Sequence, residues 1–325
     1  MTVFLIRRLM QSAVVLFVVS VLVFAGVYAI GNPLDLLIDS RATQAEIEQI
    51  TRNLGLDKPL WEQYFVFLGA VLQGDFGHSF IYNEPAIKLI LQRLPATLEL
   101  AFAALVIATV ASIPLGIWAG LKPRSVAGRA IMAGSVLGFS LPSFWVGLML
   151  IMVFSIMLGW LPTIGRGETV EVFGIGLSIL TWDGLKHIIL PALNLSIFAM
   201  ALLVRLVRAG MLETLSLDYV RFARAKGVPT RRIVLVHVLK NILIPIITVL
   251  GIEFGLILAF AVVTETVFAW PGMGKLIIDA INLLDRPVIV AYLMVTVLIF
   301  IIINFVVDVL YSIIDPRVRL AGSGE

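Results

Sequence analysis

The residues of this chain that could do acid–base, nucleophilic or metal chemistry form almost no pattern typical of a site. It has no cysteine, which excludes a thiolate metal site, a cysteine nucleophile and a disulfide framework. The three histidines, His78, His187 and His237, are far apart in the sequence and lack the spacing of metal ligands. The exception is Glu253, an acid near the middle of the apolar run Asn241–Thr264.

Glu253 has three interpretations. A carboxylate at the centre of a membrane costs about 3 kcal/mol or more unless it faces protein or water, so such residues are often functional. Glu253 could therefore pack helices together, line a transport pathway, or carry the proton of a secondary transporter. Asn194, inside the apolar run Ile188–Val204, has the first two of these interpretations. Secondary transporters commonly contain internal repeats, and the two halves of this chain show no convincing one.

A nucleotide-hydrolysing site is not encoded in the sequence. Gly274-Lys275 is like the end of a phosphate-binding loop, but Ala269 occupies the position of the first glycine. Leu276 replaces the Ser or Thr that would hold Mg²⁺. We therefore expect a non-enzymatic chain without a cofactor. If ATP powers it, separate subunits must bind the ATP and Mg²⁺.

Composition places the chain in a membrane. Of its 325 residues, 60% are hydrophobic and only 14% are charged, and the mean hydropathy is +1.05. These values lie far outside the range of soluble domains. The net charge of +3 is small and gives no reason to expect a nucleic-acid partner. We expect an all-α integral membrane protein.

Six apolar runs predict six membrane spans, at 1.5 Å of rise per helical residue and about 30 Å of hydrocarbon. They are Leu9–Ile30, Leu100–Leu121, Ala130–Leu158, Ile188–Val204, Asn241–Thr264 and Val288–Val307. Pro114 and Gly116 are expected to bend or loosen the second span. A break at Pro142 that splits the third run into two short spans is the alternative, and it would invert the topology downstream. With six spans, most lysines and arginines lie on the side of both termini, which the positive-inside rule assigns to the cytoplasm.

One long, strongly basic segment, Tyr219–Pro245, lies between two apolar runs. Apolar residues are interleaved with its bases, which predicts two short amphipathic helices. Between them, Gly227-Val228-Pro229 has the residues typical of one helix end and the next helix start. Composition alone favours an ordinary cytoplasmic loop without a specific partner.

The patterns of this segment carry a family resemblance. Y-x-R-x-A-R-A-K-G (Tyr219–Gly227) and H-x-L-x-N-x-L-x-P (His237–Pro245) resemble the cytoplasmic loop of binding-protein-dependent ABC importer permeases, in particular their dipeptide, oligopeptide and nickel branch. Where the wider superfamily has Glu-Ala-Ala, this chain has Arg221-Phe222-Ala223, as that branch does. The resemblance implies a coupling helix that docks on a separate ATPase. The residues concerned are Tyr219, Arg221, Ala223, Arg224, Ala225, Lys226 and Gly227.

Further matches to the branch extend along nearly the whole chain. They are LGLDKPLWEQY (Leu54–Tyr64), GDFGHS (Gly74–Ser79), LPSFWVG (Leu141–Gly147), LGWLP (Leu158–Pro162) and ETVFAWPGMG (Glu265–Gly274). The first two lie in the largest polar segment, where Thr43–Asn53 and Trp61–Leu72 are predicted helices. The resemblance implies that an extracytoplasmic substrate-binding protein docks here. The residues assigned to that role are Trp61, Tyr64, Asp75, Phe76 and Trp270.

The resemblance as a whole implies a six-span permease with the type I ABC importer fold, in a bacterial inner membrane. Residues 1–30 would form the N-terminal segment and first span, and 31–95 an extracytoplasmic loop domain with short helices. Residues 96–320 would form a five-span core with the coupling loop 209–240, and 321–325 a tail. The implied partners are a second homologous permease, as a heterodimer, two ABC ATPases and a substrate-binding protein. The implied substrates are di- and oligopeptides, and a nickel chelate, glutathione, an opine or an oligosaccharide remains an alternative.

Overall fold

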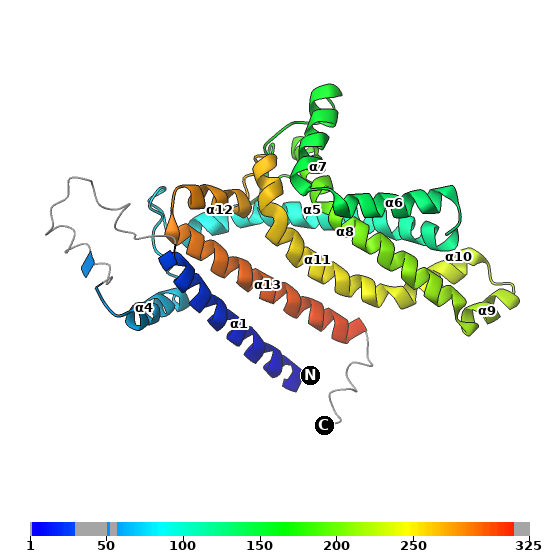
Figure 1. Cartoon of the computed structure of the whole chain (residues 1–325), viewed down its shortest axis with the longest axis horizontal. Coiled ribbons are helices and arrows are strands. Elements are labelled where there is room, and N and C mark those ends of the chain that lie inside the picture. Colours follow the sequence, from blue (N-terminus) through cyan, green and yellow to red (C-terminus); the bar gives the residue numbers. More distant parts are fainter. Residues whose placement is uncertain (1, 30–50, 53–56, 315–325) are drawn as a thin grey trace. The chain divides into compact units, whose positions relative to one another are not determined.

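The computed structural model describes residues 2–29, 51–52 and 57–314. Most of the predicted helix Thr43–Asn53 and all of the tail 321–325 lie outside these residues. The chain divides into two compact units, one made of residues 1–93 and 276–301 and the other of 94–275 and 302–325. The described part of each unit is mainly helical, as predicted (Figure 1).

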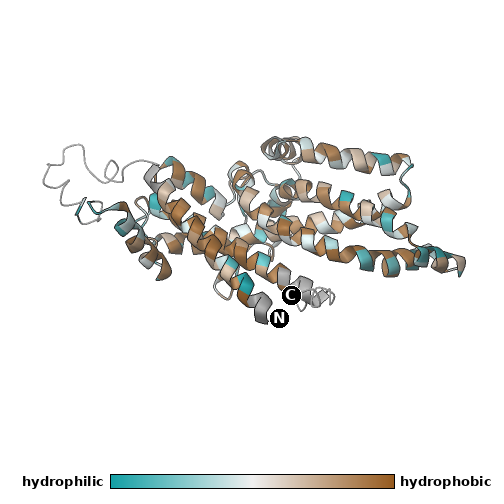
Figure 2. Cartoon of the chain, turned by 60° about the horizontal axis from the view of Figure 1, so that its bottom comes forward, coloured by the Kyte–Doolittle hydropathy of each residue, from teal (hydrophilic) through white to brown (hydrophobic). Residues whose placement is uncertain are grey.

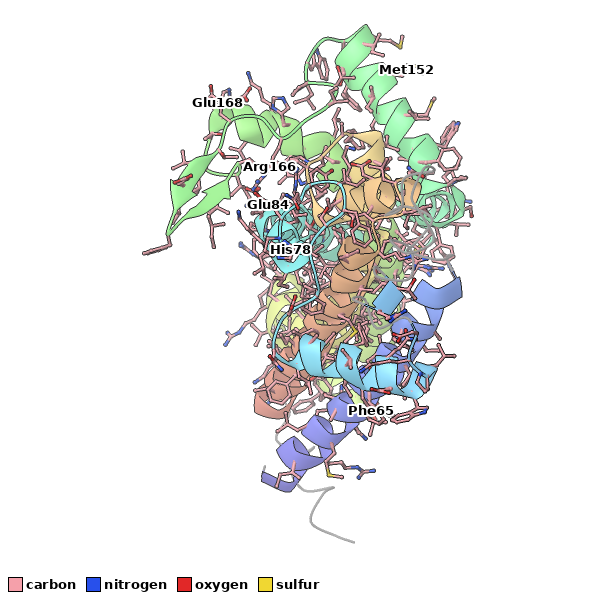
Figure 3. All side chains as sticks on the ribbon, turned by 90° about the vertical axis from the view of Figure 1, so that its left-hand side faces the viewer. Phe65, His78, Glu84, Met152, Arg166 and Glu168 are labelled. Carbon is pink, nitrogen blue, oxygen red and sulfur yellow. The ribbon has the colours of Figure 1, made fainter. Side chains whose placement is uncertain are left out.

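In the first unit, a short helix folds against the N-terminal span. This unit contains α1 (Thr2–Ala29), α4 (Leu60–Leu72), the start of α5 (Ala86–Leu121) and the larger parts of α12 (Met273–Asn282) and α13 (Arg286–Ile314). The hydroxyl groups of Ser20 on α1 and Tyr64 on α4 are 2.8 Å apart. Phe65 lies on the outer side of α4 and is 63% exposed (Figure 3). The predicted helix Trp61–Leu72 is confirmed, with its aromatic residues divided between a packed face and an exposed one.

The second unit holds the basic segment and most of the long helices. After α5 come α6 (Val126–Ser140), α7 (Ser143–Leu150), the π-helical η1 (Ile151–Met157), the strands β1 (Val170–Val172) and β2 (Ile175–Leu177), and α8 (Trp182–Ser216). They are followed by α9 (Asp218–Ala225), α10 (Thr230–Arg232), the π-helical η2 (Ile233–Val238) and α11 (Leu239–Val267). The strands pair as an antiparallel hairpin through a turn at Phe173 and Gly174, which both have positive φ.

Five described helices are long and apolar enough to cross a membrane, and they become six spans if a bent pair counts as one. That pair is α6 with α7 and η1, which meet at an angle of 110°. The predicted third span, Ala130–Leu158, is therefore not one continuous helix. The break lies at Leu141-Pro142, because the residue before a proline is driven out of the helical region, and Leu141 has φ −83° and ψ 135°.

The other spans are confirmed, although α5 and α8 extend well beyond their predicted limits. Their apolar parts lie at the predicted positions, and Figure 2 shows hydrophobic residues along most of the length of the long helices. α5 begins at Ala86 rather than Leu100, and α8 runs from Trp182 to Ser216 rather than from Ile188 to Val204. Hydropathy locates the part of a helix that is in hydrocarbon, but backbone hydrogen bonds continue into the polar flanks.

Two glycines let α5 and α8 pack closely. Gly116 and Gly120 are one helical turn apart on α5, and a Cβ at these positions would lie 2.6 Å from Val207 Cβ and 2.5 Å from Met211 Cβ. The carbonyl oxygen of Val204 would also lie 3.0 Å from a Cβ on Gly116. This is the small-residue spacing with which membrane helices bring their backbones together. Gly116 is therefore a packing residue in a continuous helix.

We expect Gly116→Leu to destabilise the protein by about 1–3 kcal/mol, because a bulky side chain cannot enter this contact without moving α8. Thermal unfolding of the detergent-solubilised protein would measure the change. Gly134→Leu on α6 is the matched control, since a Cβ there meets nothing within 4 Å. Equal melting temperatures for the two variants would contradict the close α5–α8 packing.

Candidate coupling surface and transport pathway

The basic segment forms a short helix, α9, at the end of α8. Leu217, with φ −69° and ψ 146°, ends α8 and allows the chain to turn into Asp218–Ala225. Asp218 in the first turn and Arg224 in the last turn both complement the helix dipole. Val220 is 0% exposed and holds α9 against the rest of the unit. Apart from the half-buried Ala223, the other side chains of α9 are exposed.

Gly227 ends α9 with a Schellman motif. Its N–H donates to the carbonyl of Arg224 at 2.9 Å, and the N–H of Val228 donates to the carbonyl of Ala223 at 3.1 Å. The motif requires a left-handed residue at this position, and Gly227 has φ +76°. Pro229 then precedes α10, as the sequence predicted for a second helix start. The first short helix and the turn are confirmed, but the predicted second short helix continues through η2 into α11 as one helix, Thr230–Val267.

Five of the predicted coupling side chains are exposed on α9 and its C-terminal cap, namely Tyr219, Arg221, Arg224, Ala225 and Lys226. Gly227 is exposed as well, whereas Ala223 is half-buried and offers less surface to a partner. Sequence reasoning missed Phe222, whose side chain is 62% exposed with Lys226 Nζ 4.6 Å from the ring centroid. A large apolar residue on a short basic helix was the available signal, but the pattern Y-x-R-x-A-R-A-K-G specifies no residue at this position.

Tyr219 connects α9 to the next span. The side-chain amide of Asn241 donates a hydrogen bond to the Tyr219 hydroxyl. Asn241 lies in the first turn of α11, so this bond joins the two motifs that carry the resemblance. α9 is therefore joined to α11 by a side-chain contact as well as through the chain.

Glu253 and Asn194 line one cavity of ≈ 230 Å³, bounded by α6, α7, α8 and α11. Their exposed fractions are 2% and 4%. The Asn194 amide donates to Thr264 Oγ1 at 2.8 Å, which leaves its carbonyl oxygen without a hydrogen-bond partner among the described residues. Glu253 Oε2 likewise has no such partner in this part of the chain. Both predicted pathway residues therefore line the same cavity.

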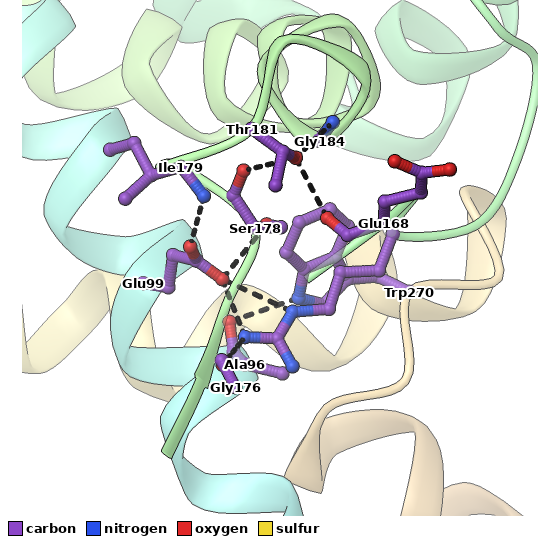
Figure 4. Close-up of polar contacts among 10 residues, drawn as sticks. Ala96, Glu99, Glu168, Gly176, Ser178, Ile179, Thr181, Gly184 and Trp270 are labelled. Atoms are coloured by element: carbon purple, nitrogen blue, oxygen red, sulfur yellow. Dashed lines mark hydrogen bonds and ion pairs between the residues drawn. The ribbon is translucent and has the colours of Figure 1, made fainter. Parts of the chain in front are cut away.

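An ion pair fixes the loop between η1 and α8 to α5. Arg166 donates to Glu99 Oε2 from Nη2 at 2.6 Å and from Nε at 3.1 Å. Ser178 Oγ and the N–H of Ile179 donate to the same carboxylate, and Arg166 Nη2 also donates to the Gly176 carbonyl (Figure 4). The side chains of Glu99 and Arg166 are 3% and 14% exposed. Sequence reasoning missed this cluster because its members are far apart in the chain.

The motif ETVFAWPGMG has a structural explanation. Glu265 is buried, accepts hydrogen bonds from Thr97 Oγ1 at 2.7 Å and from the N–H of Lys275 at 3.0 Å, and so holds the start of α12. A side chain on Gly272 would overlap the Glu265 carboxylate. Trp270 is 0% exposed and its Nε1 donates to the Ala96 carbonyl at 2.9 Å. The docking role predicted for Trp270 is therefore wrong, because its side chain faces the interior.

The other predicted docking residues lie in the first unit. Trp61 and Asp75 are exposed, whereas Tyr64 and Phe76 are half-buried. Phe76 packs on a buried cluster formed by Val23, Val290 and Met294, and Asp75 Oδ1 accepts a hydrogen bond from the N–H of Gly77 at 2.8 Å. In the same motif, Ser79 Oγ donates to the buried Asp285. In GDFGHS, Phe76 and Ser79 thus have structural contacts inside the unit, whereas Gly74, Asp75 and His78 are exposed.

Comparisons with known proteins agree with this arrangement. Residues 112–320 match the family described as binding-protein-dependent transport system inner membrane component, and residues 1–101 match its N-terminal family. The di/tripeptide transport system permease protein DppB of Pseudomonas aeruginosa (strain UCBPP-PA14) is 40% identical, over 97% of this chain and 98% of that protein. The oligopeptide transport system permease protein AppB of Bacillus subtilis (strain 168) is 39% identical, over 98% and 100%. The glutathione transport system permease protein GsiC of Escherichia coli (strain K12) is 39% identical, over 97% and 98%.

The fold has a counterpart among solved structures. A chain of the MetNI methionine ABC transporter, in an inward-facing conformation, superposes with a TM-score of 0.55 at 17% identity and covers 70% of this chain and 96% of its own length. The family matches cover nearly all of the chain, and the helices that carry α9 and the cavity lie inside the larger match. This multi-pass membrane protein belongs to the family of inner membrane components of binding-protein-dependent transport systems.

Proposed function

We propose that this protein is the permease subunit of an ATP-driven importer for short peptides in the inner membrane of a bacterium. It pairs with a second, homologous permease, two ATPase subunits and an extracytoplasmic substrate-binding protein. ATP and Mg²⁺ bind to the ATPases, and this chain carries no cofactor and catalyses no reaction. The observation that carries the proposal is α9, whose one fully buried side chain leaves an exposed basic and aromatic face beside two spans.

Short peptides are the substrate class that the relatives support. The relatives named for di/tripeptides, oligopeptides and glutathione, itself a tripeptide, are similar to this chain at 40%, 39% and 39% identity. Glu253 as the proton carrier of a secondary transporter finds no support in these names. The choice among peptides rests with the binding protein that delivers them.

The exposed residues of α9 and its C-terminal cap can interact with an ATPase in two ways, by electrostatic attraction and by an apolar contact. Arg221, Arg224 and Lys226 are exposed on α9 or its cap and attract an acidic groove, which accelerates association. Phe222 supplies the contact, because burial of a Phe side chain contributes about 1.5–3 kcal/mol. Tyr219 then passes the motion of the docked helix to α11 through Asn241.

A pull-down tests the proposal. The tagged chain is solubilised from its native membrane, and every co-purifying protein is identified. We expect a second permease and one or two ATPases of the P-loop class. Recovery of this chain alone, with ATP-independent uptake of solute in proton-loaded vesicles, would overturn the importer assignment.

We expect Phe222→Asp to lower recovery of the ATPases about tenfold or more, since a loss of 1.4 kcal/mol is a factor of ten in binding. The second permease should co-purify as before. Val126→Asp is the control, because Val126 is also a large apolar residue, 76% exposed, at the start of α6 and close in sequence to Lys122 and Arg124. Undiminished ATPase recovery with Phe222→Asp would show that the docking contact lies elsewhere.

A further inference from the structure

The cavity that contains Glu253 has apolar walls and very few polar groups. Phe139 on α6, Phe198 on α8 and Phe260 on α11 contribute aromatic rings to it. These rings are 47%, 43% and 64% exposed, so the cavity is accessible from the surface of this unit. Its polar residues are Ser143, Asn194 and Glu253. Both unpartnered groups, the Asn194 carbonyl and Glu253 Oε2, are hydrogen-bond acceptors.

No basic residue lines the cavity within the described chain. The guanidinium of Arg205 lies 5.1 Å from the centroid of the Phe139 ring, and its Nε donates to the Ala201 carbonyl at 3.2 Å. Arg205 thus contacts the Phe139 ring and the Ala201 carbonyl, but it is not itself one of the residues that line the cavity. No basic side chain of the described chain is therefore placed to pair with the Glu253 carboxyl group, whose Oε2 also lacks a hydrogen-bond partner there.

The Asn194 carbonyl and Glu253 Oε2 lie at different positions along the axis of α11. Asn194 bonds to Thr264, which is three helical turns from Glu253 on α11, or about 16 Å along the axis at 1.5 Å per residue. One small cation therefore cannot contact both groups. Glu253 is near the middle of α11, and Asn194 is closer to the end of α11 that is followed by Trp270.

A buried carboxylate with a free oxygen favours a positively charged hydrogen-bond donor. An ammonium group offers three N–H donors and a full opposite charge, and charge-assisted hydrogen bonds are about twice as strong as neutral ones. Aromatic walls add a cation–π attraction for the same ligand. An anion would be repelled by the carboxylate and would find no basic side chain in the lining.

We propose that Glu253 is a cation site on the translocation pathway, where it holds the free ammonium group of the peptide while the apolar walls contact the adjoining side chain. This inference rests on the proposed function, because it assumes that the cavity is part of a peptide pathway. It names the chemical group that the permease itself recognises, independently of the binding protein. Asn194 is a separate acceptor for a backbone N–H, nearer to the Trp270 end of α11.

The absence of cysteine allows a direct test on the assembled importer. Leu256→Cys places a reporter on the cavity wall one turn from Glu253, and Ile252→Cys places one beside Glu253 on the same helix but outside the cavity. Each is labelled with a cationic reagent, trimethylammonium-ethyl methanethiosulfonate, and with an anionic one, sulfonatoethyl methanethiosulfonate. Labelling is followed on this chain after separation of the subunits.

The ratio of the labelling rate with the cationic reagent to that with the anionic reagent should be at least tenfold higher at Leu256→Cys than at Ile252→Cys. Adding Glu253→Gln should lower it to the Ile252→Cys value, and Glu253→Asp should preserve most of it. L-alanyl-L-alanine should slow labelling at Leu256→Cys, and its N-acetyl derivative should not. Equal ratios at the two positions, no effect of Glu253→Gln, or equal protection by both peptides would overturn the cation site.

Uptake of radiolabelled dialanine by the unmodified importer separates the two proposals. ATP-dependent uptake together with equal labelling ratios would remove the cation site and leave the peptide importer. A high, Glu253-dependent ratio without uptake of any peptide would retain a cation site and reject the peptide as its ligand, which overturns the inference as stated.

Discussion

Replacing Gly227 by proline should abolish the ATP hydrolysis that substrate and binding protein stimulate, while the chain still inserts into the membrane. Proline fixes φ near −65°, whereas Gly227 has φ +76°. The substitution also removes the N–H that donates to the Arg224 carbonyl. Both bonds of the Schellman motif depend on this geometry, so α9 would lose its defined end and its orientation toward α10 and α11.

The experiment compares the assembled importer with Gly227→Pro and with Gly174→Pro. Gly174 also has φ +76°, and a Cβ there meets nothing within 4 Å, but it lies in the turn of the β1–β2 hairpin. We expect normal amounts of both variants in the membrane and a coupling defect only in the first. Gly227→Ala should show a partial defect, because a left-handed conformation costs a non-glycine residue about 1–2 kcal/mol. Normal stimulated hydrolysis in Gly227→Pro would contradict the coupling role of α9.

Removing Arg166 should have the largest effect on stability. In Arg166→Met the Glu99 carboxylate keeps its bonds from Ser178 and Ile179 but loses its positive partner, while it stays buried. Breaking a buried ion pair in this way costs about 3–5 kcal/mol. The loss should be local, since the pair holds the loop between η1 and α8 on α5.

Hydrogen exchange measures that loss residue by residue. Amides of the β1–β2 hairpin and of Ile179 should exchange far faster in Arg166→Met, and those of α9 should not change. The double variant Glu99→Gln/Arg166→Met should recover part of the protection, because it removes the uncompensated charge. If both single and double variants exchanged like the wild type, the ion pair would not hold the loop.

The sequence determines some of these features locally and leaves others to tertiary contacts. Spans follow from hydropathy, and the end of α9 follows from Gly227 and Pro229, because both depend on neighbouring residues. The break at Pro142 was identifiable for the same reason, but hydropathy alone favoured one long span. The limits of α5 and α8 were missed, since polar residues can continue a helix outside hydrocarbon.

Site residues illustrate the same division. Trp270 and Phe76 stand in motifs that suggested docking, yet they pack against residues from other parts of the chain. Their burial depends on partners such as Ala96, which the sequence does not place near Trp270. Glu253 and Asn194 were identifiable as unusual polar residues in apolar runs, and only the fold shows that they line a common cavity. Phe222 was identifiable as a large apolar residue on a short basic helix. The pattern Y-x-R-x-A-R-A-K-G specifies no residue at its position, so the residue was not assigned to the site.

The glycine contact between α5 and α8 has a mechanical consequence. Because Val207 and Met211 of α8 pack directly on the backbone of α5 at Gly116 and Gly120, we expect the two helices to resist sliding past each other. α8 has 35 residues and is about 52 Å long at 1.5 Å per residue, with α9 at one end and the hairpin loop before the other. The part of α8 from Pro191 to Ser216 is about 38 Å long, so a tilt of about 5° at the α9 end is expected to displace the helix at Pro191 by about 3 Å. We therefore expect the two glycines to keep α5 and α8 moving together when α9 is displaced.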